Sequence, residues 1–214
     1  VKHPYETVFT DPGFVYAAEH SYDISAIQPQ VAAPSSVDNV SDLAAWAGRP
    51  VDQAFIGTCT GGRVADLAVA ARILAGRKVH PRTRLLVVPA SKGVFLEAMN
   101  QGYVQQLVEA GATFVTPGCA ACLGGPVDTF GRINKSGIKC ISATNRNFPG
   151  RMGDKESQVF LASPATVAAS ALTGSGFCSR AAALPSLSGA MTATGTQRTR
   201  NAPAATGARS WRQS

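Results

Sequence analysis

The most regular hydrophobic pattern begins at Gln53. Residues 53–58 form a short apolar run of the kind that is typical of a buried strand. Residues 63–75 then repeat apolar positions at helical spacing and stop at Gly76, so we expect a helix there. The alternation continues, and it predicts strands at 84–89, 113–116, 139–143 and 158–162 and helices at 94–100, 104–110 and 164–172.

Strands separated by helical stretches favour right-handed crossovers and a mostly parallel sheet that is covered on both faces. The fold class that we expect is therefore α/β, a three-layer α/β/α sandwich. In such sheets ligands bind at the carboxyl ends of the strands, in the loops that follow them. The candidate chemistry should lie in those loops.

The two ends of the chain have weaker patterns. We expect residues 1–52 to be an entry segment that continues from a missing amino-terminal part, with a short strand at 22–27 and a short helix at 39–49. Residues 53–174 would then be the α/β domain. Residues 175–214 contain no acidic residue and few large apolar ones, which is typical of disorder, although a natural linker or translation in a different reading frame would give the same composition.

The formal net charge of +7 first suggests a nucleic-acid partner. Five arginines of the last 36 residues carry most of this charge, and they are not clustered with lysines or interleaved with several aromatic residues. We therefore expect no nucleic-acid partner. The sequence also shows neither an apolar run of membrane-spanning length nor an export signal, so we expect a cytoplasmic protein without a membrane partner.

The cysteines are the first candidate for chemistry. Cys59 directly follows the predicted strand 53–58, and Cys119 and Cys122 follow the predicted strand 113–116 as a Cys-Ala-Ala-Cys pair. If both strands belong to one parallel sheet, the three thiols leave it at the same edge. Three soft thiolate ligands at one edge indicate a metal site.

Several interpretations of these thiols remain open at this point. A disulfide is disfavoured because the chain has an odd cysteine count and no export signal. A structural zinc ion would need a fourth ligand, and Cys140 lies inside an apolar strand where a buried free thiol fits better. An iron–sulfur site, a zinc site and incidental cysteines are the alternatives. A cluster held by three thiolates would leave one iron open as a Lewis acid, which suits hydration and dehydration.

A second constellation follows the predicted strand 139–143. Asn145, Arg146 and Arg151 lie in a loop with a Pro-Gly turn, which would let two guanidinium groups meet one carboxylate-bearing ligand. Two surface arginines in a polar loop are the alternative. The three histidines are dispersed, and we assign them no role.

Three segments resemble the aconitase superfamily in order and spacing, with the large subunit of 3-isopropylmalate dehydratase and its relatives, homoaconitase and 2,3-dimethylmalate dehydratase, as the nearest members. The segments are Ile56–Thr60 (IGTCT), Pro117–Leu123 (PGCAACL) and Asn145–Arg151 (NRNFPGR). The resemblance covers residues 22–174, and it favours the iron–sulfur alternative. It also implies the fold of the aconitase iron–sulfur domain.

The resemblance implies a [4Fe-4S] cluster ligated by Cys59, Cys119 and Cys122. It places Asn145, Arg146 and Arg151 in the active site, with the arginines on the carboxylates of a hydroxy-diacid substrate. It further implies a hydro-lyase that isomerises 2-isopropylmalate and 3-isopropylmalate by dehydration and rehydration in leucine biosynthesis, together with a small-subunit partner that forms the swivelling domain.

Two departures from the family pattern limit these expectations. Gly61 stands where the family usually has Asn, so a polar contact near the cluster is expected to be missing. The segments that supply catalytic histidines, acids and the serine-type base lie outside this chain, so we assign no catalytic residue within it. A non-catalytic metal-binding module and an inactive truncated product are the hypotheses of other classes.

Overall fold

The computed structural model describes residue 4, residues 6–175 and residues 196–199. The chain divides into two units, Val1–Ile27 with Ala190–Ser214 and Gln28–Gly189, which are described separately here. Cys178 and nearly all of the tail predicted at 175–214 lie outside the described residues. Within the described part of the chain, no helix has the length and apolar character needed to cross a membrane.

The smaller unit contains a two-stranded antiparallel pairing of β1 (Ala18–Ser21) with β9 (Thr196–Thr199). The strand predicted at 22–27 is wrong, because a 3-10 turn, η1 (Ile24–Ala26), occupies this segment. The Asp23 carboxylate accepts hydrogen bonds from the backbone N–H of Ser25 at 2.9 Å and from its hydroxyl at 2.6 Å. These bonds lower the pKa of Asp23, and they favour a turn over an extended chain.

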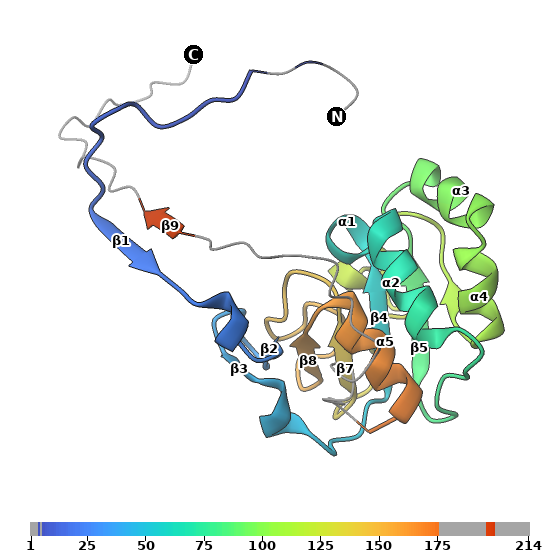
Figure 1. Ribbon diagram of the computed structural model, residues 1–214. Coiled ribbons are helices and arrows are strands. Elements are labelled where there is room, and N and C mark those ends of the chain that lie inside the picture. Colours follow the sequence, from blue (N-terminus) through green and yellow to red (C-terminus); the bar gives the residue numbers. More distant parts are fainter. Residues whose placement is uncertain (1–3, 5, 176–195, 200–214) are drawn as a thin grey trace, which may run out of the picture. The chain divides into compact units, whose positions relative to one another are not determined.

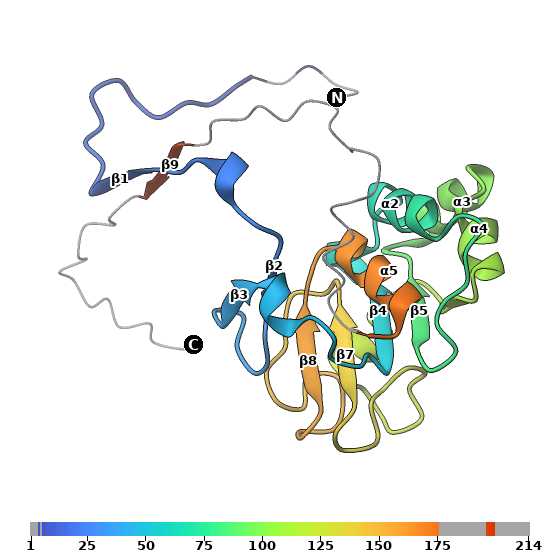
Figure 2. The same cartoon turned by 60° about the horizontal axis from the view of Figure 1, so that its bottom comes forward.

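The larger unit is built on a seven-stranded sheet in the order β3-β2-β8-β7-β4-β5-β6 (Figures 1 and 2). The strands from β8 to β6 in this order run parallel, whereas β2 and β3 are antiparallel at one edge. The predicted α/β fold with a mostly parallel sheet is confirmed. The strands are β2 (Gln30–Ala32), β3 (Val40–Asp42), β4 (Gln53–Gly57), β5 (Arg84–Val88), β6 (Thr113–Phe114), β7 (Lys139–Ser142) and β8 (Gln158–Leu161).

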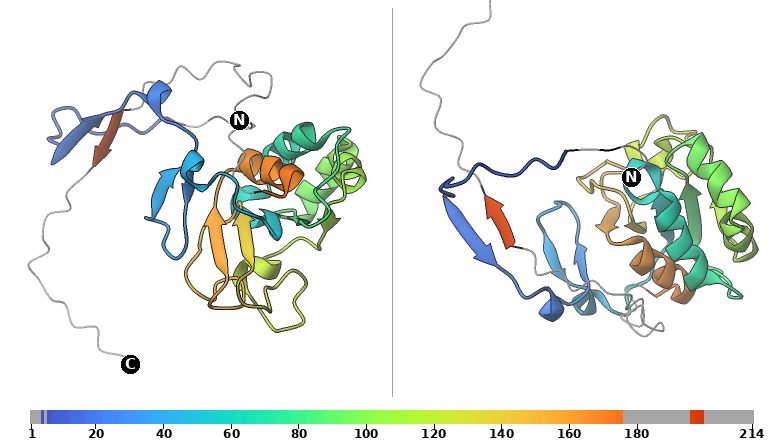
Figure 3. Two further views of the ribbon diagram at one scale, coloured as in Figure 1. Left: turned by 90° about the horizontal axis from the view of Figure 1, so that it is seen from below. Right: turned by 45° about the horizontal axis from the view of Figure 1, so that its top comes forward.

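The two faces of the sheet are covered differently. The four longer helices lie together on one face, while the chain between β6 and β8 covers the other with loops and the 3-10 turn η3 (Ala120–Leu123) (Figure 3). The helix side packs Leu67, Leu85 and Ile141, and the loop side packs Phe55, Leu86 and Met152. The helices are α2 (Val64–Leu74), α3 (Lys92–Asn100), α4 (Tyr103–Glu109) and α5 (Pro164–Thr173).

The helix ends follow local chemistry that the sequence shows. Ser91 and Ser163 cap α3 and α5 by accepting hydrogen bonds from the backbone N–H of Val94 and Thr166. Gly174 ends α5 in the left-handed conformation. The predicted helices at 63–75, 94–100, 104–110 and 164–172 are therefore confirmed to within a few residues.

The sheet includes β2 and β3, which both precede the predicted domain boundary at residue 53. The short helix expected at 39–49 is instead β3 followed by the 3-10 turn η2 (Leu43–Trp46). Trp46 packs edge-on against Phe160 of β8 with ring centroids 5.0 Å apart, which attaches this segment to the core. The compact unit accordingly starts at Gln28, and the assignment of residues 53–174 as the cluster-bearing domain stays a prediction.

Candidate functional site

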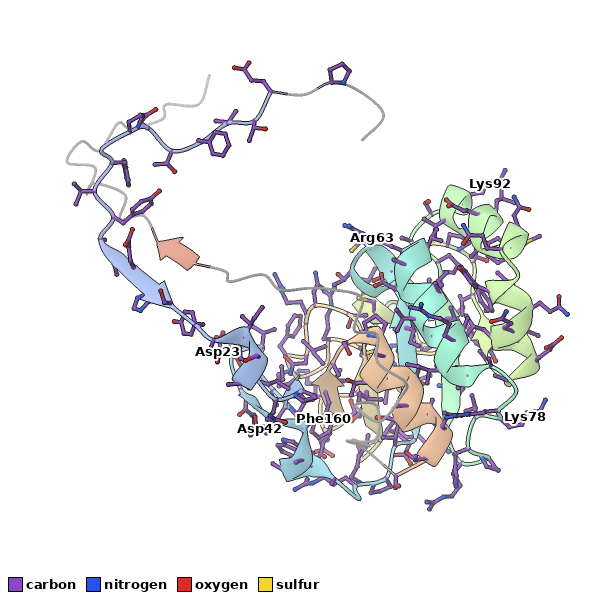
Figure 4. All side chains as sticks on the ribbon, in the orientation of Figure 1. Asp23, Asp42, Arg63, Lys78, Lys92 and Phe160 are labelled. Carbon is purple, nitrogen blue, oxygen red and sulfur yellow. The ribbon has the colours of Figure 1, made fainter. Side chains whose placement is uncertain are left out.

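A single helical turn, α1 (Thr58–Gly61), carries Cys59 at the carboxyl end of β4. Glycines let this turn approach its neighbours closely. A Cβ atom on Gly61 would lie 2.4 Å from the carbonyl oxygen of Ala143, which follows β7, and one on Gly62 would lie 2.6 Å from the carbonyl oxygen of Val88, which ends β5. The turn is therefore held between the ends of the two strands that flank β4. Arg63, labelled in Figure 4, directly precedes α2, and Lys78 lies in the segment between α2 and β5.

Backbone strain is concentrated beside the cysteines. Among the described residues, the non-glycine residues with positive φ are Thr58, at 63°, and Ala120, at 42°. Thr58 directly precedes Cys59, and Ala120 directly follows Cys119. A β-branched residue is rare in this conformation, and such strain clusters at active sites and ligand-binding turns. The hydroxyl oxygen of Thr58 is also buried without a hydrogen-bond partner.

The Cys119–Cys122 pair lies at the turn η3, beyond the end of β6. The backbone N–H of Cys122 donates to the carbonyl of Cys119 at 3.0 Å, which closes the turn. Cys122 is only 4% exposed, and it packs in the same apolar cluster as Phe55 and Leu86. Cys119 is exposed, as is Cys59. The pair therefore has one thiol in the core and one that faces solvent.

The loop after β7 contacts this pair through Arg151. Nη2 of Arg151 donates to Sγ of Cys122 over 3.8 Å. The guanidinium also lies 5.7 Å from the ring centroid of Phe148, and its Nε is buried without a partner. A cysteine and an arginine that are 29 residues apart in sequence thus meet at one edge of the sheet.

The other two predicted substrate residues, Asn145 and Arg146, are exposed in the same loop. Nη1 of Arg146 donates to the backbone carbonyl of Asn145 at 2.7 Å. The Arg146 guanidinium therefore contacts its own loop, whereas the Arg151 guanidinium contacts η3. A common carboxylate ligand would need Arg146 to leave its present acceptor.

Asn147 is a structural residue of this loop to which the sequence assigned no role. It is 2% exposed, and its Nδ2 donates to the carbonyls of Ala33 at 2.8 Å and Ser36 at 3.2 Å. These bonds join the loop to the β2–β3 hairpin. Its position between Asn145 and Arg151 in the motif was the available signal, but nothing in the sequence indicates burial there.

Cys140 is separate from the other described thiols. It is fully buried near the amino end of β7, where it pairs in register with Gln53, the first residue of β4. Burial raises the pKa of the Cys140 thiol to about 12. A thiol at this end of the strand is a poor fourth ligand for the others, which argues against a zinc site that includes Cys140.

A cavity of about 320 Å³ also lies at the amino ends of the strands, away from the predicted site. Its walls include Asp52, Arg84 and Arg132, and no predicted site residue lines it. Several of these groups already have partners: Nε of Arg132 donates to the carbonyl of Gly125 at 3.1 Å, and the Asp52 carboxylate accepts from the backbone N–H of Lys139 at 2.8 Å. Among the described residues, Arg132 and Asp52 therefore have structural roles at this end of the sheet.

The described residues contain no group of three His, Cys, Asp or Glu side chains close enough to hold a single metal ion. The thiolates of a cubane cluster bind different irons, so their sulfur atoms stand farther apart than around one ion. Three thiolate donors, Cys59, Cys119 and Cys122, are the ligand type that suits an iron–sulfur cluster. At the same edge, the Thr58 hydroxyl and Arg151 Nε are buried polar groups without a hydrogen-bond partner. The residues present therefore fit an iron–sulfur cluster.

Comparison with known families gives one match, which covers most of the larger unit. The profile of the Aconitase family (aconitate hydratase) matches residues 44–174. The matched segment begins in η2 and ends at the glycine that closes α5. It therefore includes the two loops that carry the cysteines and the loop that carries Arg146 and Arg151.

Individual relatives are half identical to this chain. It is 50% identical over 167 residues to 3-isopropylmalate dehydratase large subunit 1 of Deinococcus radiodurans, covering 78% of this chain and 38% of the relative. It is 50% identical over 171 residues to the probable methanogen homoaconitase large subunit of Methanosarcina mazei, covering 80% and 42%. It is 49% identical over 167 residues to the homoaconitase large subunit of Thermus thermophilus, covering 78% and 39%. The matched region thus spans about two fifths of these relatives.

Proposed function

The chain belongs to the aconitase family, and we propose that it is the cluster-bearing part of the large subunit of a hydro-lyase that interconverts 2-isopropylmalate and 3-isopropylmalate. Relatives that are half identical and carry the 3-isopropylmalate dehydratase name support this activity. Others named homoaconitase keep that enzyme as the second candidate, beside 2,3-dimethylmalate dehydratase. A place in leucine biosynthesis and a cytoplasmic location stay predictions.

We assign Cys59, Cys119 and Cys122 as ligands of a [4Fe-4S] cluster. The observation that carries this assignment is the strained backbone at Thr58 and Ala120, each next to a proposed ligand. Strain at both turns is understandable if their geometry is set by a shared ligand rather than by local preference. When bound, the cluster would supply one open iron that acts as a Lewis acid on a substrate hydroxyl.

We assign Asn145, Arg146 and Arg151 to substrate binding. Arginine forks bind carboxylates through paired hydrogen bonds, and a hydroxy-diacid offers two carboxylates. Arg146 is exposed, and its acceptor among the described residues is its neighbour's carbonyl, so a carboxylate can replace that contact at low cost. The role of these residues is to orient the diacid so that its hydroxyl faces the cysteine loops.

We assign no catalytic acid or base within this chain. The names of the relatives, each a large subunit, support a small-subunit partner, which we expect to complete the active site as the swivelling domain. The proposed substrate is a small hydroxy-diacid, and we propose neither a nucleic-acid nor a membrane partner.

Anaerobic reconstitution of the chain with ferrous iron and sulfide tests the cluster assignment. We expect a brown protein with the broad visible absorption of thiolate-to-iron charge transfer and about four iron and four sulfide ions per chain. Cys59→Ser, Cys119→Ser and Cys122→Ser should each lose most of this absorption. Cys140→Ala is the matched control and should keep it, because Cys140 is buried at the other end of the strand.

Two results would contradict the assignment. One zinc ion per chain without iron or sulfide would favour the non-catalytic metal module. Full absorption in a Cys59→Ser variant would show that Cys59 is not a ligand.

The substrate is tested on the loaded protein by adding 2-isopropylmalate, homocitrate or 2,3-dimethylmalate. The proposed activity requires that 2-isopropylmalate perturbs the cluster spectrum at the lowest concentration.

A further inference from the structure

The contact between Arg151 and Cys122 goes beyond substrate binding. Nη2 of Arg151 lies 3.8 Å from Sγ of Cys122, within the range of a hydrogen bond to sulfur. The thiol is 4% exposed, and the guanidinium is half-buried. Because the sulfur is buried and the guanidinium is partly buried, the interaction between a positive donor and this sulfur is stronger than it would be at the surface.

The backbone around Arg151 is fixed from several sides, so this contact does not depend on a free surface loop. The N–H of Arg151 donates to the carbonyl of Phe148 at 3.0 Å, and the N–H of Ile133 donates to the carbonyl of Met152 at 2.9 Å. A Cβ atom on Gly124, just after η3, would lie 3.2 Å from the Arg151 carbonyl oxygen. The loop therefore also packs against the residue that follows η3, close to the side-chain contact.

The remaining N–H groups of Arg151 show that the guanidinium is placed for more than one partner. An arginine carries five N–H donors, and here Nε is buried without an acceptor. A buried donor without a partner costs free energy, which the fold recovers when a ligand supplies the acceptor. One side of the guanidinium thus faces a cysteine sulfur while Nε remains available to an anion.

Resting on the proposed function, we propose that Arg151 is a positioning residue for the cluster, which holds the Cys122 thiolate by an N–H···S hydrogen bond and raises the reduction potential of the cluster. A reduced cluster carries one more negative charge, so a positive donor on a ligand sulfur stabilises it more than the oxidised cluster. Arg151 then links the cluster to the substrate-binding loop through one side chain.

The test compares reduction potentials of the reconstituted 214-residue chain, measured by anaerobic redox titration followed by electron paramagnetic resonance. We expect Arg151→Gln to disfavour reduction at least tenfold, equal to a shift of about 59 mV to more negative potential for a one-electron couple. Arg151→Lys keeps the charge but not the fork, and it should give an intermediate value. It also serves if the glutamine variant fails to fold, as judged from its thermal melt.

Arg146→Gln is the matched control, since it removes the same charge from the same loop while its guanidinium contacts a backbone carbonyl instead of a cysteine. The equilibrium constant for reduction of the cluster should stay within threefold of its value in the unmodified chain. An unchanged potential in both Arg151 variants overturns the inference and leaves the proposed function standing. Failure of the unmodified chain to take up iron and sulfide overturns the proposed function and the inference with it.

Discussion

Gly61 packs directly against the backbone of Ala143, so that a Cβ atom at position 61 would lie 2.4 Å from the Ala143 carbonyl oxygen and 2.7 Å from its Cβ. The first residue belongs to the turn that carries Cys59, and the second follows β7 at the start of the arginine loop. Gly61 stands where the family usually has Asn, and we expect a polar contact to be missing there. The same position is where two backbones approach each other closely. Here the glycine has a packing role.

We predict that Gly61→Ala destabilises the chain by about 1–3 kcal/mol, because the added methyl group forces the turn and the Ala143 carbonyl apart. Chemical denaturation of the apo protein measures this change. Gly93→Ala is the control, since Gly93 lies in α3 and an added Cβ would meet nothing closer than 3.8 Å. That change should stabilise by up to about 1 kcal/mol. Equal effects at the two positions would contradict the packing role of Gly61.

We predict that Asn147→Ala costs about 2 kcal/mol of unfolding free energy, because the carbonyls of Ala33 and Ser36 lose their side-chain donor in a buried place. Urea denaturation measures the loss. Asn145→Ala changes an exposed amide in the same motif and should stay within about 0.5 kcal/mol of the unmodified chain. A neutral Asn147 variant would mean that the loop is held by other contacts.

The Cys140 thiol gives a pH prediction. Its pKa is raised from an ordinary value of 9.0 to about 12 in the folded chain, chiefly by burial. Above pH 9 the unfolded chain releases this proton while the folded chain keeps it, so the contribution to stability is complete below pH 9 and is lost as the pH rises toward 12. We expect unfolding free energy to fall by about 1 kcal/mol per pH unit above pH 9.

Urea midpoints between pH 7 and pH 10.5 measure this dependence, and Cys140→Ala should remove most of the fall. A variant that keeps the full slope would assign the loss to other groups. Alkylation of the apo protein at pH 8 provides an independent readout. Cys59 and Cys119 should react first because they are exposed, and Cys140 only after unfolding.

Ala120 gives a prediction about backbone strain. Its φ of 42° disfavours an alanine, so Ala120→Gly should stabilise the apo chain by about 0.5–1 kcal/mol. Ala121→Gly is the control, because Ala121 is fully buried and its methyl group packs in the core. That change should destabilise by about 1 kcal/mol. A destabilised Ala120→Gly variant would show that the turn is not strained.

The sequence was sufficient for the main elements of the larger unit. The period of the apolar residues located β4, β5, β7 and β8 and the four longer helices, because burial on one or two faces leaves a direct imprint on residue order. It failed at 22–27, where a 3-10 turn replaces the expected strand, and at 39–49, where β3 and a 3-10 turn replace the expected helix. Short polar side chains and tertiary packing decide the local structure in both segments. The motif residues were also evident in the sequence, since their identities and spacing carry the family resemblance.

Tertiary structure alone decided how those motifs meet. That Arg151 contacts Cys122, that Asn147 reaches the β2–β3 hairpin and that Gly61 lies against Ala143 all depend on strand order and on the path of loops between them. Local pattern records which face of an element is buried, but it contains no information on which distant residue fills the space opposite. For this chain, sequence determined the elements and the candidate chemistry, and packing determined which side chains act on one another.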